Sequence, residues 1–376
     1  MRTCLLSILL LGHLLLSAPS SSAATITVDV NGSGDFLSIP EGVDAASSGD
    51  TVLVLPGVYP STENRNISCR GLPMVIMSRD GREATILNMD APSCEMTGFL
   101  FDAGEGRDTI VDGFTVQGYN VLFGCSGFLC GGAASPTIRN CRFTECYADG
   151  YMHIDGWGAA GCVFGGSPLF EDCVFDNNHA YATAGGVFLD GPAQPIFERC
   201  VFIDNTDSWE GSGSAFVHDC VAQFRNCVFK HHPRSSAVVV DWGGYASFTN
   251  CTFVGNSGGP IIGTHDSGCR FDVLNSVFAF NDSEGIIGDD GISSVTHCCL
   301  YETGTDSLPG QTAPNIWLDP RFCGFPADDL TLCADSPCLP ENNDWEELIG
   351  AYGEGCPPCG TAVERHSWGT IKALFR

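Results

Sequence analysis

This chain of 376 residues carries a formal net charge of −28, although only 16% of its residues are charged. Nucleic acid is excluded as a partner, because contacts to phosphates need many Lys and Arg side chains and the chain has 17. The 46 glycines and 24 phenylalanines indicate many turns and an aromatic β core rather than helices.

The first 24 residues have the pattern of a secretory signal peptide. A positively charged start precedes an apolar run from Leu5 to Leu16, and small residues from Ser17 to Ala24 provide a cleavage site. The alternative, a membrane anchor, is disfavoured because His13 interrupts a run that is too short to span about 30 Å of hydrocarbon. We therefore expect a secreted or cell-surface monomer with no transmembrane segment after cleavage.

One motif, Pro-x-hydrophobic-x-x-Cys-x-Phe or a close variant, recurs every 24 to 32 residues through the middle of the chain. That interval is too short for a β-α-β unit, and no helical period appears within it. Each repeat is therefore predicted to be one coil of short strands and turns, stacked on the next at about 4.8 Å. The motif contains Cys141, Cys173, Cys200, Cys227 and Cys251, and a degenerate copy has Ser276 at that position.

Equivalent side chains of stacked coils are expected to align into ladders. The Cys and Phe of each motif are two residues apart and so face the same side of a strand. Neighbouring cysteines would lie within disulfide range, but in-register side chains point the same way, so we predict mostly unbonded thiols in the core. An amide ladder three residues after the Phe can bond backbone groups along the stack. Its members are Asn178, Asn205, Asn256 and Asn281.

Earlier segments extend the solenoid toward the N-terminus. Thr51–Val54, Met74–Met77 and Val111–Val116 have the pattern of strands from earlier coils, which gives about nine or ten coils in all. Ser38-Ile-Pro-Glu41 is a capping-box pattern that predicts a short helix to about Ala46 rather than a loop. Such a helix would cover the open edge of the first coil.

Residues 356–376 are predicted to be a cysteine-bearing tail after a β-helix domain of residues 25–355. The Cys356-Pro-Pro-Cys359 spacing occurs in redox and zinc motifs, but this chain end lacks the βαβ context of a redox motif. Zinc would need a second pair, and Cys333 with Cys338 is loosely spaced for that, so local disulfides are favoured. Residues 362–376 are open to three interpretations: a helical cap, a tag for export or surface anchoring, or a disordered terminus.

Segments near both ends of the chain resemble a known family. Val28 to Ile39, followed by Gly49 to Tyr59, looks like the start of bacterial pectin-lyase-like β-helix proteins. Leu318 to Phe322 and Ile349 to Ala351 resemble the closing segment of right-handed parallel β-helix repeat proteins. The resemblance spans nearly all of the mature chain and implies an all-β, right-handed parallel β-helix solenoid, which the N-terminal capping helix would begin. It implies little about activity, since this fold carries many functions.

No complete catalytic set from the enzymes of this fold is found in the sequence. The motifs of pectin methylesterases are missing, and the arginine base that pectate lyases need has few candidates in the coils. Asn205-Thr-Asp207 and Asp289-Asp290 match two polygalacturonase motifs, but they lie several coils apart, and Asn205 already belongs to the repeat. We therefore expect a non-enzymatic protein.

Aspartates follow the second strand of three successive coils. If they stack, their carboxylates lie roughly 5 Å apart, which is unfavourable unless they are solvated or bridged by a cation such as calcium. The alternative is a solvated turn position that favours Asp. These residues are Asp190, Asp219 and Asp241. Nearby candidates for a sugar-facing surface are His153, Trp157, Trp209, Trp242 and His265.

Three functions stay open from the sequence. The favoured one is a non-enzymatic extracellular protein that binds or displays to a carbohydrate-rich surface, with polysaccharide or cell-envelope components as partners. The second is a lyase or hydrolase that acts on acidic polysaccharide, and the third is a structural cell-envelope repeat. No cofactor is expected to be required, and calcium is the one ion that the aspartates suggest.

Overall fold

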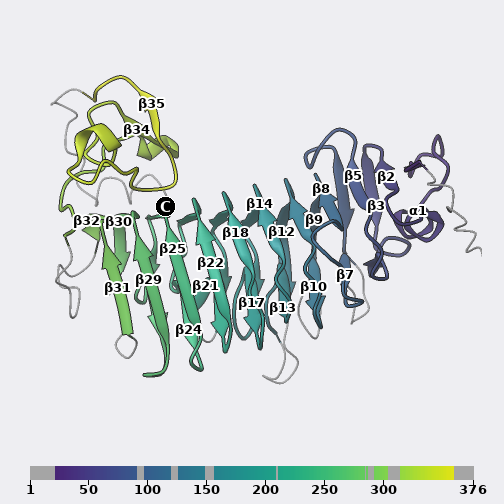
Figure 1. The fold of residues 1–376 in the computed structure, drawn as a ribbon, viewed down its shortest axis with the longest axis horizontal. Coiled ribbons are helices and arrows are strands. Elements are labelled where there is room, and N and C mark those ends of the chain that lie inside the picture. Colours follow the sequence, from purple (N-terminus) through teal and green to yellow (C-terminus); the bar gives the residue numbers. More distant parts are fainter. Residues whose placement is uncertain are drawn as a thin grey trace, which may run out of the picture.

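The computed structural model describes residues 22–90, 97–119, 126–148, 156–208, 211–283, 285–286, 292–303 and 314–359. In these residues the chain forms an elongated solenoid whose successive coils lie side by side along the long axis (Figure 1). Most of the predicted signal peptide, His153, Trp209 and the segment after Cys359 lie outside the described residues. No helix in the described ranges is long and apolar enough to cross a membrane.

Three parallel sheets form the walls of the solenoid, and sheet A is the most regular of them. Within the described residues, sheet A consists of β1 (Thr25–Val28), β2 (Thr51–Val54), β5 (Val75–Ser78), β8 (Ile110–Asp112), β11 (Thr137–Arg139), β14 (Leu169–Glu171), β18 (Ile196–Glu198), β22 (Val221–Arg225), β25 (Tyr245–Thr249), β29 (Arg270–Leu274) and β31 (Ile292–Thr296). These eleven strands indicate about eleven coils, so the predicted nine or ten was slightly low.

Sheet B follows sheet A in each coil after a tight bend. Its strands are β3 (Gly57–Pro60), β6 (Thr85–Asn88), β9 (Thr115–Tyr119), β12 (Arg142–Ala148), β15 (Val174–Asp176), β19 (Val201–Ile203), β23 (Val228–Lys230), β26 (Thr252–Val254), β30 (Val277–Ser283) and β32 (Cys299–Thr303). Three short strands extend it: β16 (His179–Ala180), β20 (Thr206–Asp207) and β27 (Ser257–Gly258).

Sheet C is the third wall and comes last in each coil. Its strands are β4 (Ile67–Ser68), β7 (Phe99–Phe101), β10 (Phe128–Gly131), β13 (Gly161–Phe164), β17 (Val187–Asp190), β21 (Ser212–His218), β24 (Ser236–Asp241) and β28 (Ile262–Thr264). All pairings within sheets A, B and C are parallel, and this agrees with the predicted coil stacking.

The predicted helix near the N-terminus is present as α1 (Ile39–Ala45). The Ser38 hydroxyl accepts the N–H of Glu41, and the Glu41 carboxylate accepts the N–H of Ser38, which completes the capping box. Ile39 and Val43 are buried, and the helix contacts β1, β2 and β4 at the N-terminal end of the solenoid.

From β11 onward, the bend between sheets A and B depends on one residue in the left-handed conformation in each coil. This residue directly precedes the ladder position, and its φ lies between 50° and 55° in seven coils. Asn and Asp tolerate this conformation better than other non-glycine residues, which explains why they dominate the position. The residues are Asn140, Asp172, Arg199, Asn226, Asn250, Asn275 and His297.

The five ladder cysteines are fully buried and unbonded, as predicted. Each thiol lies close to a carbonyl oxygen of the preceding coil; for Cys200 that oxygen belongs to Phe170, at 3.5 Å. Burial raises the pKa of the Cys200 thiol well above its usual range. In the degenerate coil the hydroxyl of Ser276 accepts the N–H of Cys251 at 3.0 Å and donates to the oxygen of Leu274. From Cys141 to Ser276 the ladder position thus holds a small group that donates a hydrogen bond, whereas the coil before Cys141 has the buried Phe114 at this level.

Two stacks of phenylalanine rings fill the core beside the thiols. Rings on sheet B stack with centroids 4.7 to 5.3 Å apart, and rings on sheet A with centroids 4.7 to 5.0 Å apart. The two stacks meet edge to face, a favoured arrangement of aromatic quadrupoles. The sheet B stack is Phe143, Phe175, Phe202, Phe229, Phe253 and Phe278; the sheet A stack is Phe170, Phe197, Phe224 and Phe248.

The amide ladder bonds successive coils at the bend after sheet B. The Asn178 side chain donates to the oxygen of Phe143 at 3.0 Å and to the Asn205 side-chain oxygen at 2.9 Å. Asn256 and Asn281 repeat this arrangement farther along the stack. Asn205 is therefore a structural residue, as the repeat predicted.

His232 occupies the amide ladder between Asn205 and Asn256 and is fully buried. Its Nδ1 lies 3.2 Å from the Asn205 carbonyl oxygen, and its Nε2 lies 2.6 Å from the Ser214 hydroxyl. Because a carbonyl only accepts, Nδ1 carries the proton and Nε2 accepts from Ser214. Burial lowers the pKa of His232 to about 3, so the ring is neutral at physiological pH.

The last described segment, up to Cys359, forms a small closing sheet that folds back onto the solenoid (yellow in Figure 1). It consists of β33 (Phe322–Gly324), β34 (Asp329–Cys333) and β35 (Glu354–Cys356), with the short 3-10 helices η2 (Phe325–Ala327) and η3 (Pro340–Asn342). The N–H of Gly350 donates to the oxygen of Asn275 at 2.8 Å, and Lys230 pairs with Asp328. The N–H of Ala351 also donates to the Thr252 hydroxyl at 3.0 Å, so contacts of this closing region reach three successive coils.

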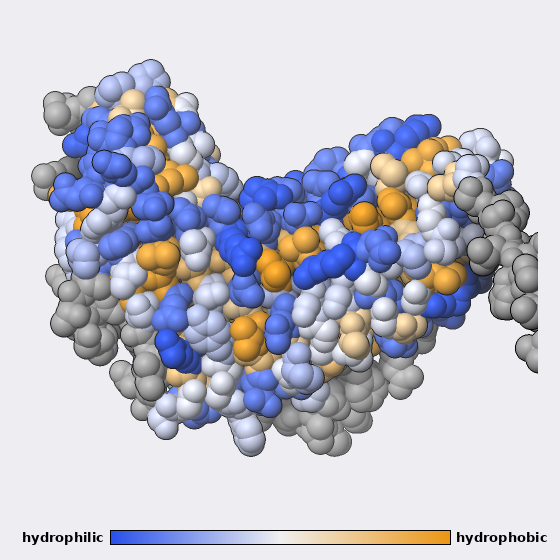
Figure 2. Space-filling model, viewed as in Figure 1, coloured by the Kyte–Doolittle hydropathy of each residue, from blue (hydrophilic) through white to orange (hydrophobic). Residues whose placement is uncertain are grey.

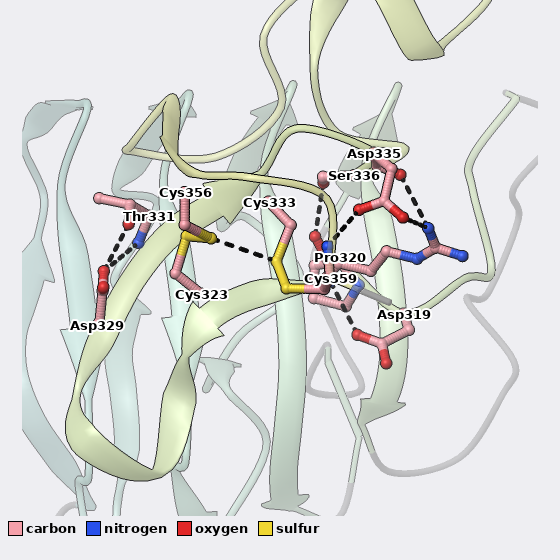
Figure 3. Close-up of a disulfide and its surroundings, with 11 residues drawn as sticks. Asp319, Pro320, Cys323, Asp329, Thr331, Cys333, Asp335, Ser336, Cys356 and Cys359 are labelled. Carbon is pink, nitrogen blue, oxygen red and sulfur yellow. Dashed lines mark hydrogen bonds and ion pairs between the residues drawn. A yellow bond between two sulfur atoms is a disulfide. The ribbon is translucent and has the colours of Figure 1, made fainter. Parts of the chain in front are cut away.

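Two disulfides cross-link the closing sheet (Figure 3). Cys323 on β33 bonds Cys356 on β35, and Cys333 on β34 bonds Cys359. The prediction of local disulfides is therefore confirmed, although each cysteine of the Cys356–Cys359 pair bonds a partner outside the pair. Arg321, in an ion pair with Asp335, lies beside them.

One face of the molecule has a mixed rather than an apolar surface (Figure 2). On the face seen in Figure 2, hydrophobic residues lie singly or in small groups among hydrophilic ones. The upper profile is hollowed between the closing sheet and the N-terminal coils.

Cys200→Asp is expected to prevent folding, because a carboxylate at this position would be buried without a partner, at a cost of several kcal/mol. Cys200→Ser should fold with a loss of about 1 kcal/mol, since Ser276 already fills the same position in its coil. Circular dichroism and urea unfolding of both variants check this. Folding of the Asp variant with an unchanged midpoint would contradict the ladder.

His232→Asn is expected to reduce the loss of stability in acid. The unfolded histidine titrates near its ordinary pKa of 6.5, whereas the folded pKa is about 3. Between these values the unfolded state binds more protons, so stability falls as the pH drops below about 6.5, by up to ~1.4 kcal/mol per pH unit. Urea midpoints measured from pH 7 to pH 5 should fall less in the variant. Parallel curves for both proteins would show that His232 is not buried neutral.

Candidate functional site

The outer face of sheet C carries two rows of side chains, because successive residues of a strand face opposite sides. In β17, Val187 and Leu189 belong to the central core, so Phe188 and Asp190 face outward. The strand registers place equivalent residues of β21 and β24 beside them. The apolar row is Phe188, Phe216 and Val239, and the polar row at the strand ends is Asp190, His218 and Asp241.

The polar row corrects one prediction. The expected stack of Asp190, Asp219 and Asp241 is wrong in its middle member, because His218 is in register with both other residues. Asp219 lies one residue beyond β21, exposed and in the left-handed conformation with a φ of 45°. A one-residue shift moves a side chain to the other face of a strand, and the sequence does not locate a strand end that closely. Calcium binding by these aspartates stays a prediction.

Asp190 and His218 form a hydrogen-bonded pair across two coils. The Nδ1 of His218 lies 2.7 Å from a carboxylate oxygen of Asp190, and both side chains are about one-third exposed. A carboxylate at one ring nitrogen fixes the orientation and tautomer of an imidazole. The pair is therefore a positioned polar group at the surface.

Aromatic rings lie along both rows. Trp157 stacks on Phe188 with ring centroids 5.2 Å apart, and Phe188 stacks on Phe216. Trp242 follows Asp241, is 70% exposed, and has its ring centroid 5.5 Å from that of His218. Two of the predicted sugar-facing residues, Trp157 and Trp242, thus belong to this face.

A second polar group lies where the loop after β28 returns beside Asp241. Ligand atoms of Asp241, Asp266 and Cys269 lie within 4.8 Å of one another, and His265 Nδ1 lies 3.8 Å from an Asp241 oxygen. The N–H of Gly268, 2.7 Å from the Asp266 carboxylate, lowers the pKa of that group, so it is ionised at neutral pH.

Sequence reasoning missed three residues of this face: His218, Asp266 and Cys269. His218 could have been found by aligning Phe188 with Phe216, because the residue two positions after each Phe must share its face. Asp266 and Cys269 had no such signal. They meet Asp241 only because two coils stack.

Comparison with known proteins identifies the architecture. Residues 75–253 match the family model described as a right-handed β-helix region. The chain is a right-handed parallel β-helix protein. No curated protein matches it. The predicted resemblance to pectin-lyase-like proteins is confirmed for the fold, and a bacterial origin stays a prediction.

Solved structures share the β-helix fold at low identity. The pectate lyase Pel9A is 14% identical, with 89% of this chain and 97% of that chain covered at a TM-score of 0.56. A pectin methylesterase from carrot is also 14% identical, with 81% and 92% covered at a TM-score of 0.44. One from Aspergillus niger has the same identity and coverage at a TM-score of 0.35. At 14% identity, the similarity to the pectate lyase shows only that the two chains share a fold. The two esterases have lower TM-scores, and nothing about this chain is inferred from them.

Proposed function

We propose that the outer face of sheet C binds carbohydrate. The observation that carries this proposal is the exposed Trp242 ring beside the Asp190–His218 pair. The C–H face of a sugar packs on an aromatic ring, while its hydroxyls exchange hydrogen bonds with carboxylate and imidazole groups. Trp157 supplies a second ring farther along the stack.

Charge favours a neutral glycan over an acidic one. The chain carries a net charge of −28, and the polar row includes Asp190 and Asp241. A uronic acid polymer would be repelled by this field unless a cation lay between the two. A neutral polysaccharide meets no such barrier.

The two disulfides favour an exported protein, because disulfides form and persist in oxidising compartments. We propose that the protein acts outside the cytoplasm, secreted or at a cell surface, and that cell-envelope glycans are its partners there.

A second candidate function is catalysis on a polysaccharide, and the Asp190–His218 pair is the observation that favours it. An imidazole oriented by a carboxylate is a competent general base or acid in lyase and hydrolase reactions. In the binding proposal, by contrast, the same pair only forms hydrogen bonds with the hydroxyl groups of the sugar.

Trp242→Ala is expected to weaken glycan binding about tenfold or more, equivalent to ~1.4 kcal/mol, because the ring supplies the stacking surface. A neutral-glycan array identifies the ligand, and titration calorimetry gives the affinities. Trp317→Ala is the matched control, since Trp317 is also exposed, at 50%, but lies outside sheet C. Equal binding by the Trp242 variant and the wild type would refute the proposed face.

Prolonged incubation with the bound glycan separates binding from catalysis. The binding proposal predicts no new reducing ends and no unsaturated products. If products form and His218→Ala abolishes them while Trp317→Ala does not, the face is a catalytic site.

A further inference from the structure

A nearly buried carboxylate at the edge of sheet C lacks a close partner. The Asp241 side chain is 12% exposed, and within the described part of the chain the basic side chain that comes nearest to its carboxylate is His265, at 3.8 Å. That distance is beyond the range of a hydrogen bond. Burying an ionised carboxylate without donors is unfavourable, so the site calls for a compensating positive charge.

The groups that face Asp241 increase the need for a positive charge at this position. Asp266 brings a second carboxylate and Cys269 a thiol, and the ligand atoms of these three residues lie within 4.8 Å of one another. Two carboxylates at this separation repel each other unless a cation lies between them. Cys269 is buried, forms no disulfide and hydrogen-bonds the Asp266 carboxylate through its thiol, so its sulfur faces the same point as the two carboxylates.

We propose that Asp241, Asp266 and Cys269, together with His265, bind one divalent transition metal ion of the zinc class. Zinc takes four ligands from thiolate, imidazole and carboxylate groups, and this set offers all three types. Calcium prefers six to eight oxygen ligands and does not use thiolate or imidazole, so it does not fit this set. Binding displaces the thiol proton of Cys269 to solvent, and no electron is transferred.

Two separate strands hold ligands of this site in position. Asp241 is the last residue of β24, and Cys269 directly precedes β29, so strands fix the backbone of both residues. Asp266 is oriented by the N–H of Gly268. The proposal goes beyond carbohydrate binding and does not depend on it, since metal binding is measured without any glycan.

The test uses the full chain, stripped of metal with a chelator under mild reductant and then titrated with Co²⁺ and Zn²⁺. We expect one ion per chain and a thiolate-to-cobalt charge-transfer band that Zn²⁺ removes. Cys269→Ser should abolish the band, and Asp241→Asn should lower the affinity at least tenfold. Circular dichroism verifies that both variants are folded.

The matched control is Cys220→Ser. Cys220 is buried and directly precedes β22, as Cys269 precedes β29, but it lies outside the ligand cluster. This variant should keep the band and the affinity. A wild-type protein that retains no ion, an equal loss in the Cys220 and Cys269 variants, or displacement of Co²⁺ by equimolar Ca²⁺ would each overturn the proposal.

Discussion

In-register stacking of the coils is the constraint on which the rest of this structure depends. A parallel coil contacts only its neighbours, so each inward position must accept the same kind of group in coil after coil. The Cys and Phe positions meet this demand by packing, and the amide ladder meets it by bonding backbone oxygens of the coil before. The left-handed residue before each ladder position makes the bend that brings these groups inward.

The same stacking builds the candidate site. Because Phe188 and Phe216 are in register, the residues two positions later, Asp190 and His218, must also be neighbours. A polar pair and an aromatic row therefore arise on the outer face of sheet C without any dedicated loop. The metal cluster follows the same logic, since Asp241 and Cys269 meet through the stacking of consecutive coils.

Much of the fold could be predicted from the sequence because the recurring motif shows which residues of successive coils are aligned. The spacing of Cys and Phe gave the buried ladders, and Ser38 with Glu41 gave the helix cap. The coil count was low because the coils at both ends lack the Cys–Phe motif. His232 was overlooked in the amide ladder, since an imidazole does not look like an amide until its two hydrogen bonds are seen.

The site was less predictable than the fold for a physical reason. The polar outward positions lie outside the core, so packing imposes no repeated residue type on them, and one residue of error at a strand end exchanged Asp219 for His218. Trp157 and Trp242 could be predicted as sugar-facing residues from their residue type. The residues that surround them could not, because these depend on the strand register. Asp266 and Asp241 are 25 residues apart and meet through a loop whose path the sequence does not specify.

Thiol labelling of the native protein, read residue by residue by mass spectrometry, tests the stacked register most directly. The ladder thiols are fully buried, so Cys173, Cys200 and Cys227 should stay unmodified until denaturant is added. All three should then react. Rapid modification of these cysteines in the absence of denaturant would contradict the register, and with it the placement of every outward residue on sheet C.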